Sequence, residues 1–245
     1  MGFLQKIWLK SRWIGTTPLQ AGELLRQSKQ IKKGLVMGMR LAVLEEQAAA
    51  VVVDSRLASV FLPGAYQLER DKMPPLRPDE KYDWLFPAKL YFLNLSAAPA
   101  EPWQPQEPLL TRDPERGLVQ LMLIADYEAQ VKNAAVFMQS MVLGRGVYEW
   151  PELHRCLKRR LDELAISLMA HNRTDVERLD KIREKTALIL KEKMNTELHN
   201  SGLVLRSINI DTLEVHSHMG RLWREHNDHF VFNLTLARSI VGYTP

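Results

Sequence analysis

Cysteine is almost absent from this chain of 245 residues, which contains only Cys156. A single cysteine excludes a disulfide within the chain. Cys156 lies in a stretch typical of the apolar side of a helix, which favours a small core residue over a nucleophile. Because a protein without disulfides suits a reducing compartment, we expect it to be cytoplasmic.

Long apolar runs are also missing. The run "AAAVVV", Ala48–Val53, has six apolar residues, whereas a membrane-spanning helix needs roughly 20. The N-terminus lacks the apolar core and the small-residue cleavage site of a secretory signal. We therefore expect a protein that stays in the cytoplasm or attaches to the inner face of the cytoplasmic membrane without crossing it.

Blocks of one charge and catalytic motifs are missing too. The 33 Lys and Arg residues are interleaved with 29 Asp and Glu residues, and the net charge is only +4, which argues against nucleic acid as a partner. The chain has no glycine-rich phosphate loop and no serine or cysteine motif with a paired histidine. We therefore expect neither an enzyme nor a bound cofactor.

The N-terminus is amphipathic. On a helical wheel, the stretch "MGFLQKIWLKSRWI" gathers large apolar side chains in one arc and cations outside it. Such a helix is typical of an element that lies in the headgroup plane of an anionic membrane, and the alternative is a helix packed on the body of the protein. The residues expected to contact the membrane are Phe3, Leu4, Lys6, Ile7, Trp8, Lys10, Arg12 and Ile14.

Residues 1–37 are expected to form an arm outside the main fold. The polar, lysine-rich stretch from Ala21 to Lys33 is predicted to be helical, and it leads to Gly34, where the pattern changes. The main fold is therefore expected to begin at residue 38.

Short β-branched segments and turn residues alternate after the arm. Gln47–Val53 is predicted to be a strand buried on both faces, with a turn at Asp54–Arg56. The pair Pro63-Gly64 turns the chain a second time. These signals predict an antiparallel meander, with Leu57–Leu62 and Ala65–Leu68 as its further strands.

Prolines crowd the next part of the chain, where ten of the thirteen lie between Pro63 and Pro114. Each removes a backbone N–H, so long helices are excluded there, and Lys89–Leu95 is the one strand clearly predicted. The segment "PAEPWQPQEP" is interpreted as a rigid loop between two subdomains, with a polyproline ligand as the alternative.

Clear periodicity returns in the second half. The stretch "LVQLMLIADYEAQV" alternates apolar and polar residues, which predicts a long half-exposed strand. Pro151 opens a helix with a leucine stripe, and Thr174 with Glu177 is interpreted as a capping box for a second helix that Gly202 ends. With "LVLRSINIDTLEV" as the closing strand, residues 111–215 predict a strand-helix-helix-strand subdomain of α+β class.

This order of segments resembles the SPFH or band 7 superfamily, which includes stomatin, prohibitin and flotillin. The resemblance rests on "FLPGAYQLE", "LLTRDPERGLVQLMLIADYEAQV", the helical pair and "HNSGLVLRSINIDTLEV", and it is nearest to the soluble bacterial branch often labelled virion core protein-like. It implies an SPFH-like α+β fold with a β-rich subdomain at 38–110, an α+β subdomain at 111–215 and a C-terminal segment at 216–245.

The resemblance implies a scaffold without catalytic residues, because members of the superfamily self-assemble on membranes and bind or regulate other proteins there. For this chain it implies a homo-oligomer on an anionic membrane surface, with an unidentified client protein and a role in stress response or membrane integrity. Two alternatives stay open, namely a soluble adaptor that never binds lipid and a metal-dependent enzyme.

The metal alternative depends on the C-terminal segment. The stretch "HSHMGRLWREHNDHF" contains four histidines in a spacing that matches no zinc motif. An apolar stripe shares the segment, which we expect to form a helix packed against another subunit, with an edge strand as the alternative. The histidines are His216, His218, His226 and His229, and the expected interface residues are Leu222, Trp223, Phe230 and Leu234.

Overall fold

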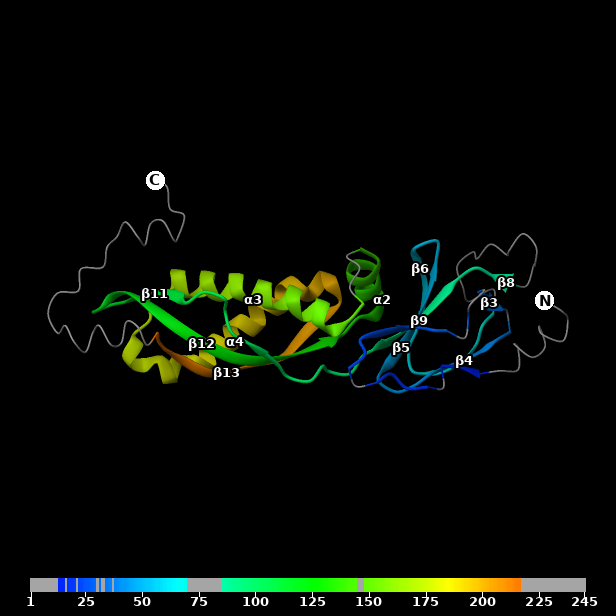
Figure 1. Cartoon of the computed structure of the whole chain (residues 1–245), viewed down its shortest axis with the longest axis horizontal. Helices are drawn as coiled ribbons and strands as arrows, with labels where there is room; N and C mark the ends of the chain where they lie inside the picture. Colours follow the sequence, from blue (N-terminus) through cyan, green and yellow to red (C-terminus); the bar gives the residue numbers. More distant parts are fainter. Residues whose placement is uncertain are drawn as a thin grey trace. The chain divides into compact units, whose positions relative to one another are not determined.

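The computed structural model describes residues 13–15, 17–20, 22–29, 31, 34–36, 38–69, 85–144 and 148–216. The chain divides into two compact units. Unit 1 takes its residues from Met1–Glu101, Tyr127–Arg159 and Lys191–Ile208, and unit 2 from Pro102–Asp126, Arg160–Leu190 and Asn209–Pro245. The division passes through the longest strands and helices, which Figure 1 labels, so each unit contains both strands and helical segments.

Unit 1 is built largely on short strands. Its largest sheet has the order β2-β9-β5-β6, from β2 (Leu25–Gln27), β9 (Lys89–Asn94), β5 (Gln47–Val53) and β6 (Arg56–Phe61). A second sheet has the order β1-β4-β7, from β1 (Trp13–Ile14), β4 (Arg40–Val43) and β7 (Gly64–Gln67), while β3 (Leu35–Val36) pairs with β8 (Leu85–Phe86). One apolar core joins the two larger sheets and includes Ile14, Leu41, Val51 and Phe92.

β5 has the predicted bounds and is buried on both faces, which explains its apolar run. Asp54 and Ser55 have φ angles of 47° and 61°, as a two-residue hairpin turn requires at its central positions. β5 and β6 therefore form the predicted hairpin. The predicted meander does not continue beyond it, because β7 leaves this sheet and pairs with β4.

The prediction of an arm over residues 1–37 is wrong for its described part. β1 pairs in parallel with β4, β2 pairs with β9 and β3 pairs with β8, so this part of the chain supplies strands to unit 1. The helix predicted over Ala21–Lys33 is also wrong, because Leu25–Gln27 is a strand. Residues 1–12 lie outside the described residues.

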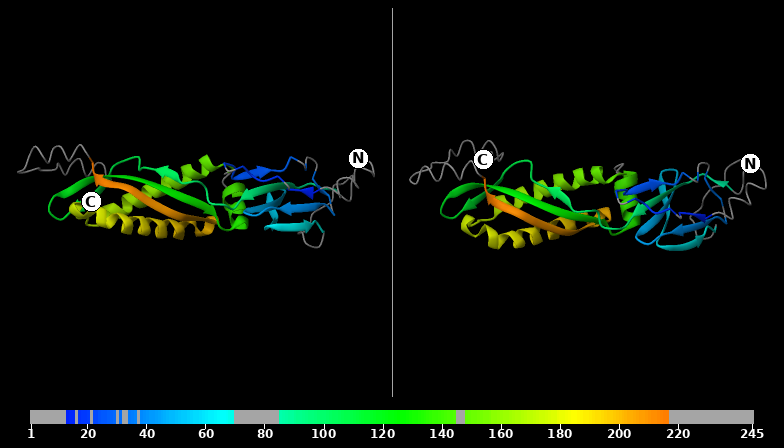
Figure 2. Two further views of the ribbon diagram at one scale, coloured as in Figure 1. Left: turned by 90° about the horizontal axis from the view of Figure 1, so that it is seen from below. Right: turned by 60° about the horizontal axis from the view of Figure 1, so that its bottom comes forward.

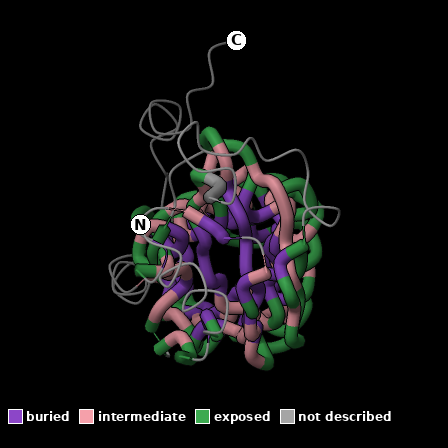
Figure 3. The backbone as a smooth tube through the Cα atoms, turned by 90° about the vertical axis from the view of Figure 1, so that its right-hand side faces the viewer, coloured by how far each residue is buried: buried purple, intermediate pink, exposed green. Residues whose placement is uncertain are grey.

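The long alternating strand is confirmed as β12 (Gly117–Val131), where every second side chain from Val119 to Val131 is at most 2% exposed. β12 pairs with β11 (Leu109–Asp113), with β10 (Glu101–Trp103) and with β13 (Leu203–Val215), whose bounds match the predicted closing strand. In Figure 2 the helices lie on one side of β12 and β13, and Figure 3 colours the buried residues purple.

Two long helices follow as predicted. α3 (Trp150–His171) buries most of its leucine stripe, at Leu153, Leu157, Leu161 and Leu168, while Cys156 is only partly buried. α4 (Leu179–Leu198) passes into the 3-10 helix η4 (His199–Ser201), which Gly202 ends with a φ of 74°. The sequence did not predict the short helix α2 (Ala134–Phe137), which continues as the π-helix η2 (Met138–Leu143).

The predicted capping box at Thr174 and Glu177 is wrong. Asp175 caps the 3-10 helix η3 (Val176–Arg178), because its side chain accepts the Glu177 N–H. Thr174 is buried and its hydroxyl lies 2.9 Å from Thr111 Oγ1 on β11. The cap and the partner of Thr174 are thus different groups from those that the local sequence indicated.

The arrangement of sheets and helices confirms the predicted α+β class. Within the part of the chain that the structure describes, no helix is both long and apolar enough to cross a membrane.

Candidate functional site

Most of the residues expected to contact a membrane lie outside the described part of the chain. Ile14 is the exception, and its prediction is wrong: it belongs to β1 and is 1% exposed in the core of unit 1, so it is not available to lipid. The residues outside the description are Phe3, Leu4, Lys6, Ile7, Trp8, Lys10 and Arg12.

The expected C-terminal sites also lie beyond the described residues, apart from His216. The backbone N–H of His216 donates to the Gln120 carbonyl at 2.9 Å, and its Nδ1 is buried without a described hydrogen-bond partner. Within the described ranges, no group of three or more His, Cys, Asp or Glu residues is placed to hold a metal ion. The residues outside are His218, His226, His229, Leu222, Trp223, Phe230 and Leu234.

A cleft of about 730 Å³ opens in unit 1 at the rim of the largest sheet. Four segments line it: the loop after β2, the β5–β6 turn, the start of β9, and the end of η2 with the residues before α3. The antiparallel register places Lys89 opposite Val52, two residues before the turn. Its main polar lining residues are Ser28, Lys29, Asp54, Lys89, Tyr91 and Tyr148.

Tyr91 is the most buried polar residue of this lining, at 7% exposure. Burial, and to a smaller extent the nearby Tyr148, raises the pKa of the Tyr91 phenol, so the hydroxyl keeps its proton at neutral pH. Among the described residues, none forms a hydrogen bond with this hydroxyl. The fold therefore leaves a protonated donor at the wall of the cleft.

A second polar cluster lies in unit 1, where β10 and β12 meet the first turns of α3; Tyr127 and His154 are buried, while Glu101 and Lys158 are partly exposed. Tyr127 Oη lies 3.0 Å from His154 Nδ1. His154 Nε2 is 4.0 Å from one oxygen of Glu101, whose other oxygen accepts a hydrogen bond from Lys158 Nζ at 2.6 Å. The Trp150 ring stacks on the imidazole with ring centroids 5.7 Å apart.

The protonation states of this cluster follow from its burial. Burial lowers the pKa of His154, more than the Glu101 carboxylate raises it, so the imidazole is neutral at neutral pH. Burial and Glu101 both raise the pKa of Tyr127. Because the carboxylate favours a proton on Nε2, Nδ1 is left to accept the Tyr127 O–H.

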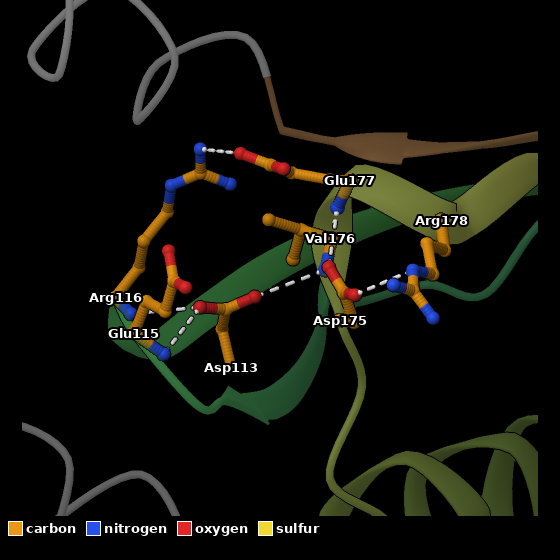
Figure 4. Close-up of polar contacts among 7 residues, drawn as sticks. All are labelled: Asp113, Glu115, Arg116, Asp175, Val176, Glu177 and Arg178. Carbon is orange, nitrogen blue, oxygen red and sulfur yellow. Dashed lines mark hydrogen bonds and ion pairs between the residues drawn. The ribbon is translucent and has the colours of Figure 1, made fainter.

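One carboxylate, that of Asp113, joins the β11–β12 turn to the start of the second long helix (Figure 4). It accepts the backbone N–H groups of Glu115 at 2.9 Å, Arg116 at 2.7 Å and Val176 at 2.9 Å. Burial raises the pKa of Asp113, but these three donors and the Arg116 charge lower it more, so the net direction is downward. The group is a structural brace, which the Arg116–Glu177 ion pair at 2.7 Å reinforces.

A family model, described as SPFH domain-Band 7 family, matches residues 25–227. The chain belongs to the SPFH domain-Band 7 family. The match begins at β2 and extends past the end of β13, so it includes β2 and β3, which lie in the segment predicted to be an arm, but not β1. A comparison with curated proteins finds no match.

Members of the band 7 family are generally non-enzymatic scaffolds that commonly oligomerise and associate with membranes. Of the three polar sites, Asp113 braces a turn, Tyr127 and His154 form a buried pair, and the cleft has a largely polar lining.

Sequence reasoning selected neither the cleft nor the buried cluster of this band 7 protein. His154 did carry a signal, because it shares a helical face with Leu153, Leu157 and Leu161, and a histidine on an apolar stripe needs a buried partner. Tyr91 carried a weaker signal as a phenol inside an apolar strand. The cleft itself had none, since its lining comes from segments far apart in the sequence.

Proposed function

We propose that the protein is a non-enzymatic oligomeric scaffold that associates peripherally with an anionic membrane surface and organises membrane or partner proteins there. Family membership carries this proposal, because band 7 proteins are generally scaffolds that commonly oligomerise and associate with membranes. The proposal goes beyond the family in naming the segment before β1 as the membrane contact and a C-terminal apolar stripe as the oligomer interface.

The charge pattern of the proposed membrane segment supports an anionic surface. Lys6, Lys10 and Arg12 are interleaved with large apolar side chains. Each such cation contributes about 1 kcal/mol near an anionic leaflet, and the apolar side chains add contact area. Because β1 is part of the core of unit 1, the proposed contact ends at residue 12.

Vesicle sedimentation of the full chain tests the membrane contact. Binding should require phosphatidylglycerol in phosphatidylcholine vesicles and should weaken with salt. Reversing three cations, in Lys6→Glu/Lys10→Glu/Arg12→Glu, should weaken binding by at least about 100-fold. A control with the same change of net charge on exposed positions of α4 is Lys181→Glu/Lys185→Glu/Lys193→Glu, which should bind as the parent does.

Deletion is a second test, and the fold decides where it ends. Removing residues 1–12 leaves β1 in place, whereas a longer deletion removes Ile14 from the core and confounds lipid binding with unfolding. The truncated protein should keep its unfolding midpoint and lose vesicle binding. Truncated protein that binds vesicles as well as the full chain would refute the proposed contact.

Particle mass separates the remaining alternatives. The proposal predicts a homo-oligomer that dissociates in Leu222→Glu/Trp223→Glu. A stable oligomer that ignores vesicles favours a soluble adaptor, and a stoichiometric metal in untagged protein favours the enzyme alternative based on His216, His218, His226 and His229.

A further inference from the structure

The cleft in unit 1 presents more hydrogen-bond donors than acceptors. The Tyr91 hydroxyl has no partner among the described residues, and Lys29 and Lys89 are exposed without an ion pair to any described residue. Asp54 is the single carboxylate of the lining. These groups favour a ligand that carries negative charge and has fewer hydrogen-bond donors than acceptors.

An apolar surface adjoins these donors. Val52, which is 4% exposed, and Leu143 line the same cleft, and Tyr148 adds an aromatic ring that is 43% exposed. A volume of about 730 Å³ lies within the range of roughly 300–1,000 Å³ typical of ligand sites, and it exceeds what a single inorganic ion fills. The cleft therefore offers apolar contacts beside its lysines.

The wall that carries Leu143 has an unusual backbone. Leu143 is the last residue of the π-helix η2, and π-helical turns occur frequently at functional sites. The Ser140 hydroxyl bonds to the Val136 carbonyl at 2.8 Å and to the Ser201 carbonyl at 3.2 Å, which fixes η2 within unit 1. This wall is therefore built independently of the lysines.

We propose that the cleft binds an extended peptide segment of a partner protein that presents a carboxylate next to an apolar side chain. The carboxylate accepts from Tyr91 and lies between the Lys29 and Lys89 ammonium groups, while the apolar side chain contacts Val52 and Leu143. The Asp54 carboxylate favours a peptide over a phosphate or another compact anion. It can accept hydrogen bonds from the backbone N–H groups of a peptide, whereas it repels a compact anion that has no such donors.

Two matched peptides test this site by isothermal titration of the full chain: acetyl-Leu-Glu-Leu-Glu-Leu-amide and its glutamine counterpart, acetyl-Leu-Gln-Leu-Gln-Leu-amide. The glutamate peptide should bind at least about tenfold more tightly, because charge-assisted hydrogen bonds are stronger than neutral ones. Its affinity should fall as salt is added. Sodium acetate at the same carboxylate concentration should not displace it, since acetate lacks the apolar part.

Variants locate the binding. Tyr91→Phe removes only the hydroxyl and should weaken binding of the glutamate peptide about tenfold, and Lys29→Gln/Lys89→Gln should weaken it by a similar factor. The control Lys185→Gln/Lys193→Gln, on exposed positions of α4, should leave affinity unchanged. Far-UV circular dichroism checks that each variant is folded.

Several outcomes would overturn the proposal: equal affinity for the two peptides, no binding of either peptide, or binding that Tyr91→Phe and the cleft lysine variant leave intact. The cleft lining and the proposed membrane contact share no residue, so the Tyr91→Phe variant should sediment with vesicles as the parent does. The variant Lys6→Glu/Lys10→Glu/Arg12→Glu, which should lose vesicle binding, should likewise bind the glutamate peptide with unchanged affinity.

Discussion

Replacing Tyr127 with phenylalanine measures what the buried cluster contributes to stability. Tyr127 is 0% exposed, and the substitution removes only the hydroxyl that lies 3.0 Å from His154 Nδ1. The ring keeps its packing, but Nδ1 loses its partner in a buried site. Since an unpaired buried polar atom costs about 1–3 kcal/mol, the free energy of unfolding should fall by about 2 kcal/mol.

A double-mutant cycle isolates the hydrogen bond from other effects. His154→Phe leaves the Tyr127 hydroxyl unpaired, whereas Tyr127→Phe/His154→Phe removes both polar groups together. The double variant should therefore lose about 1–2 kcal/mol less than the sum of the single losses. Urea denaturation followed by far-UV circular dichroism, at one protein concentration, measures the four stabilities. Additive losses would refute the reasoning.

Acid should weaken the same cluster, and the sign follows from the lowered pKa of folded His154. As the pH falls, the unfolded chain takes up this proton first, near the usual histidine value of about 6.5. The contribution of neutral His154 is thus complete above about pH 6.5 and is lost as the pH falls through the folded pKa. The parent protein should lose more stability than His154→Phe between about pH 7.5 and about pH 5.5, and equal losses contradict the assignment.

Two further substitutions test the fold. In Gly202→Ala, at a φ of 74°, the new Cβ lies 2.5 Å from the Asn133 carbonyl oxygen and 2.6 Å from the Phe137 nitrogen, so we expect a loss of more than about 3 kcal/mol. Gly117→Ala, at a φ of 76° in open space, is the control and should lose only about 1–2 kcal/mol; equal losses in urea denaturation would contradict the steric argument. Asp113→Asn replaces one of the two carboxylate oxygens, which together accept three backbone N–H groups, with an NH2 donor. The free energy of unfolding should fall by about 2 kcal/mol near pH 7. Because the folded pKa of Asp113 is lowered, the difference from the parent should shrink as the pH falls through that value, and a constant difference would contradict this.

Elements that are long relative to their period could be predicted from the sequence. Apolar and polar residues alternate along the fifteen residues of β12, and a leucine stripe with helical spacing runs along the 22 residues of α3. β1, β2 and β3 have two or three residues each, too few for any period. Their conformation comes from pairing with partners far along the chain, as Leu25 does with Leu93, and no local pattern records that pairing.

The helix cap and the polar sites could not be predicted from the sequence for the same reason. The sequence predicted Thr174 as a cap, but the Thr174 hydroxyl oxygen accepts a hydrogen bond from Thr111 on β11, and Asp113 accepts the nearby Val176 N–H. Tyr127 lies at one of the buried positions of the alternating strand, but the alternation does not indicate that its partner is His154 on α3. In the long strands and helices, local patterns predicted most of the buried side chains, while the polar partner of each buried group depends on tertiary contacts.

The position of β1 leaves the proposed membrane segment with few apolar side chains, so we expect membrane binding to depend on the proposed oligomer. Because Ile14 lies in the core, the proposed apolar contact with lipid consists of Phe3, Leu4, Ile7 and Trp8. Four partly inserted side chains and three cations amount to several kcal/mol, comparable with a single acyl chain, which binds membranes weakly and reversibly.

Assembly changes that balance, because linked copies bind one surface together and raise the effective concentration of each contact. Leu222→Glu/Trp223→Glu, which leaves residues 1–12 untouched, should therefore release the protein from vesicles as it dissociates the oligomer. Sedimentation with vesicles and particle mass, measured on the same samples, check this. A dissociated variant that still sediments with vesicles would show that one copy of the segment is enough.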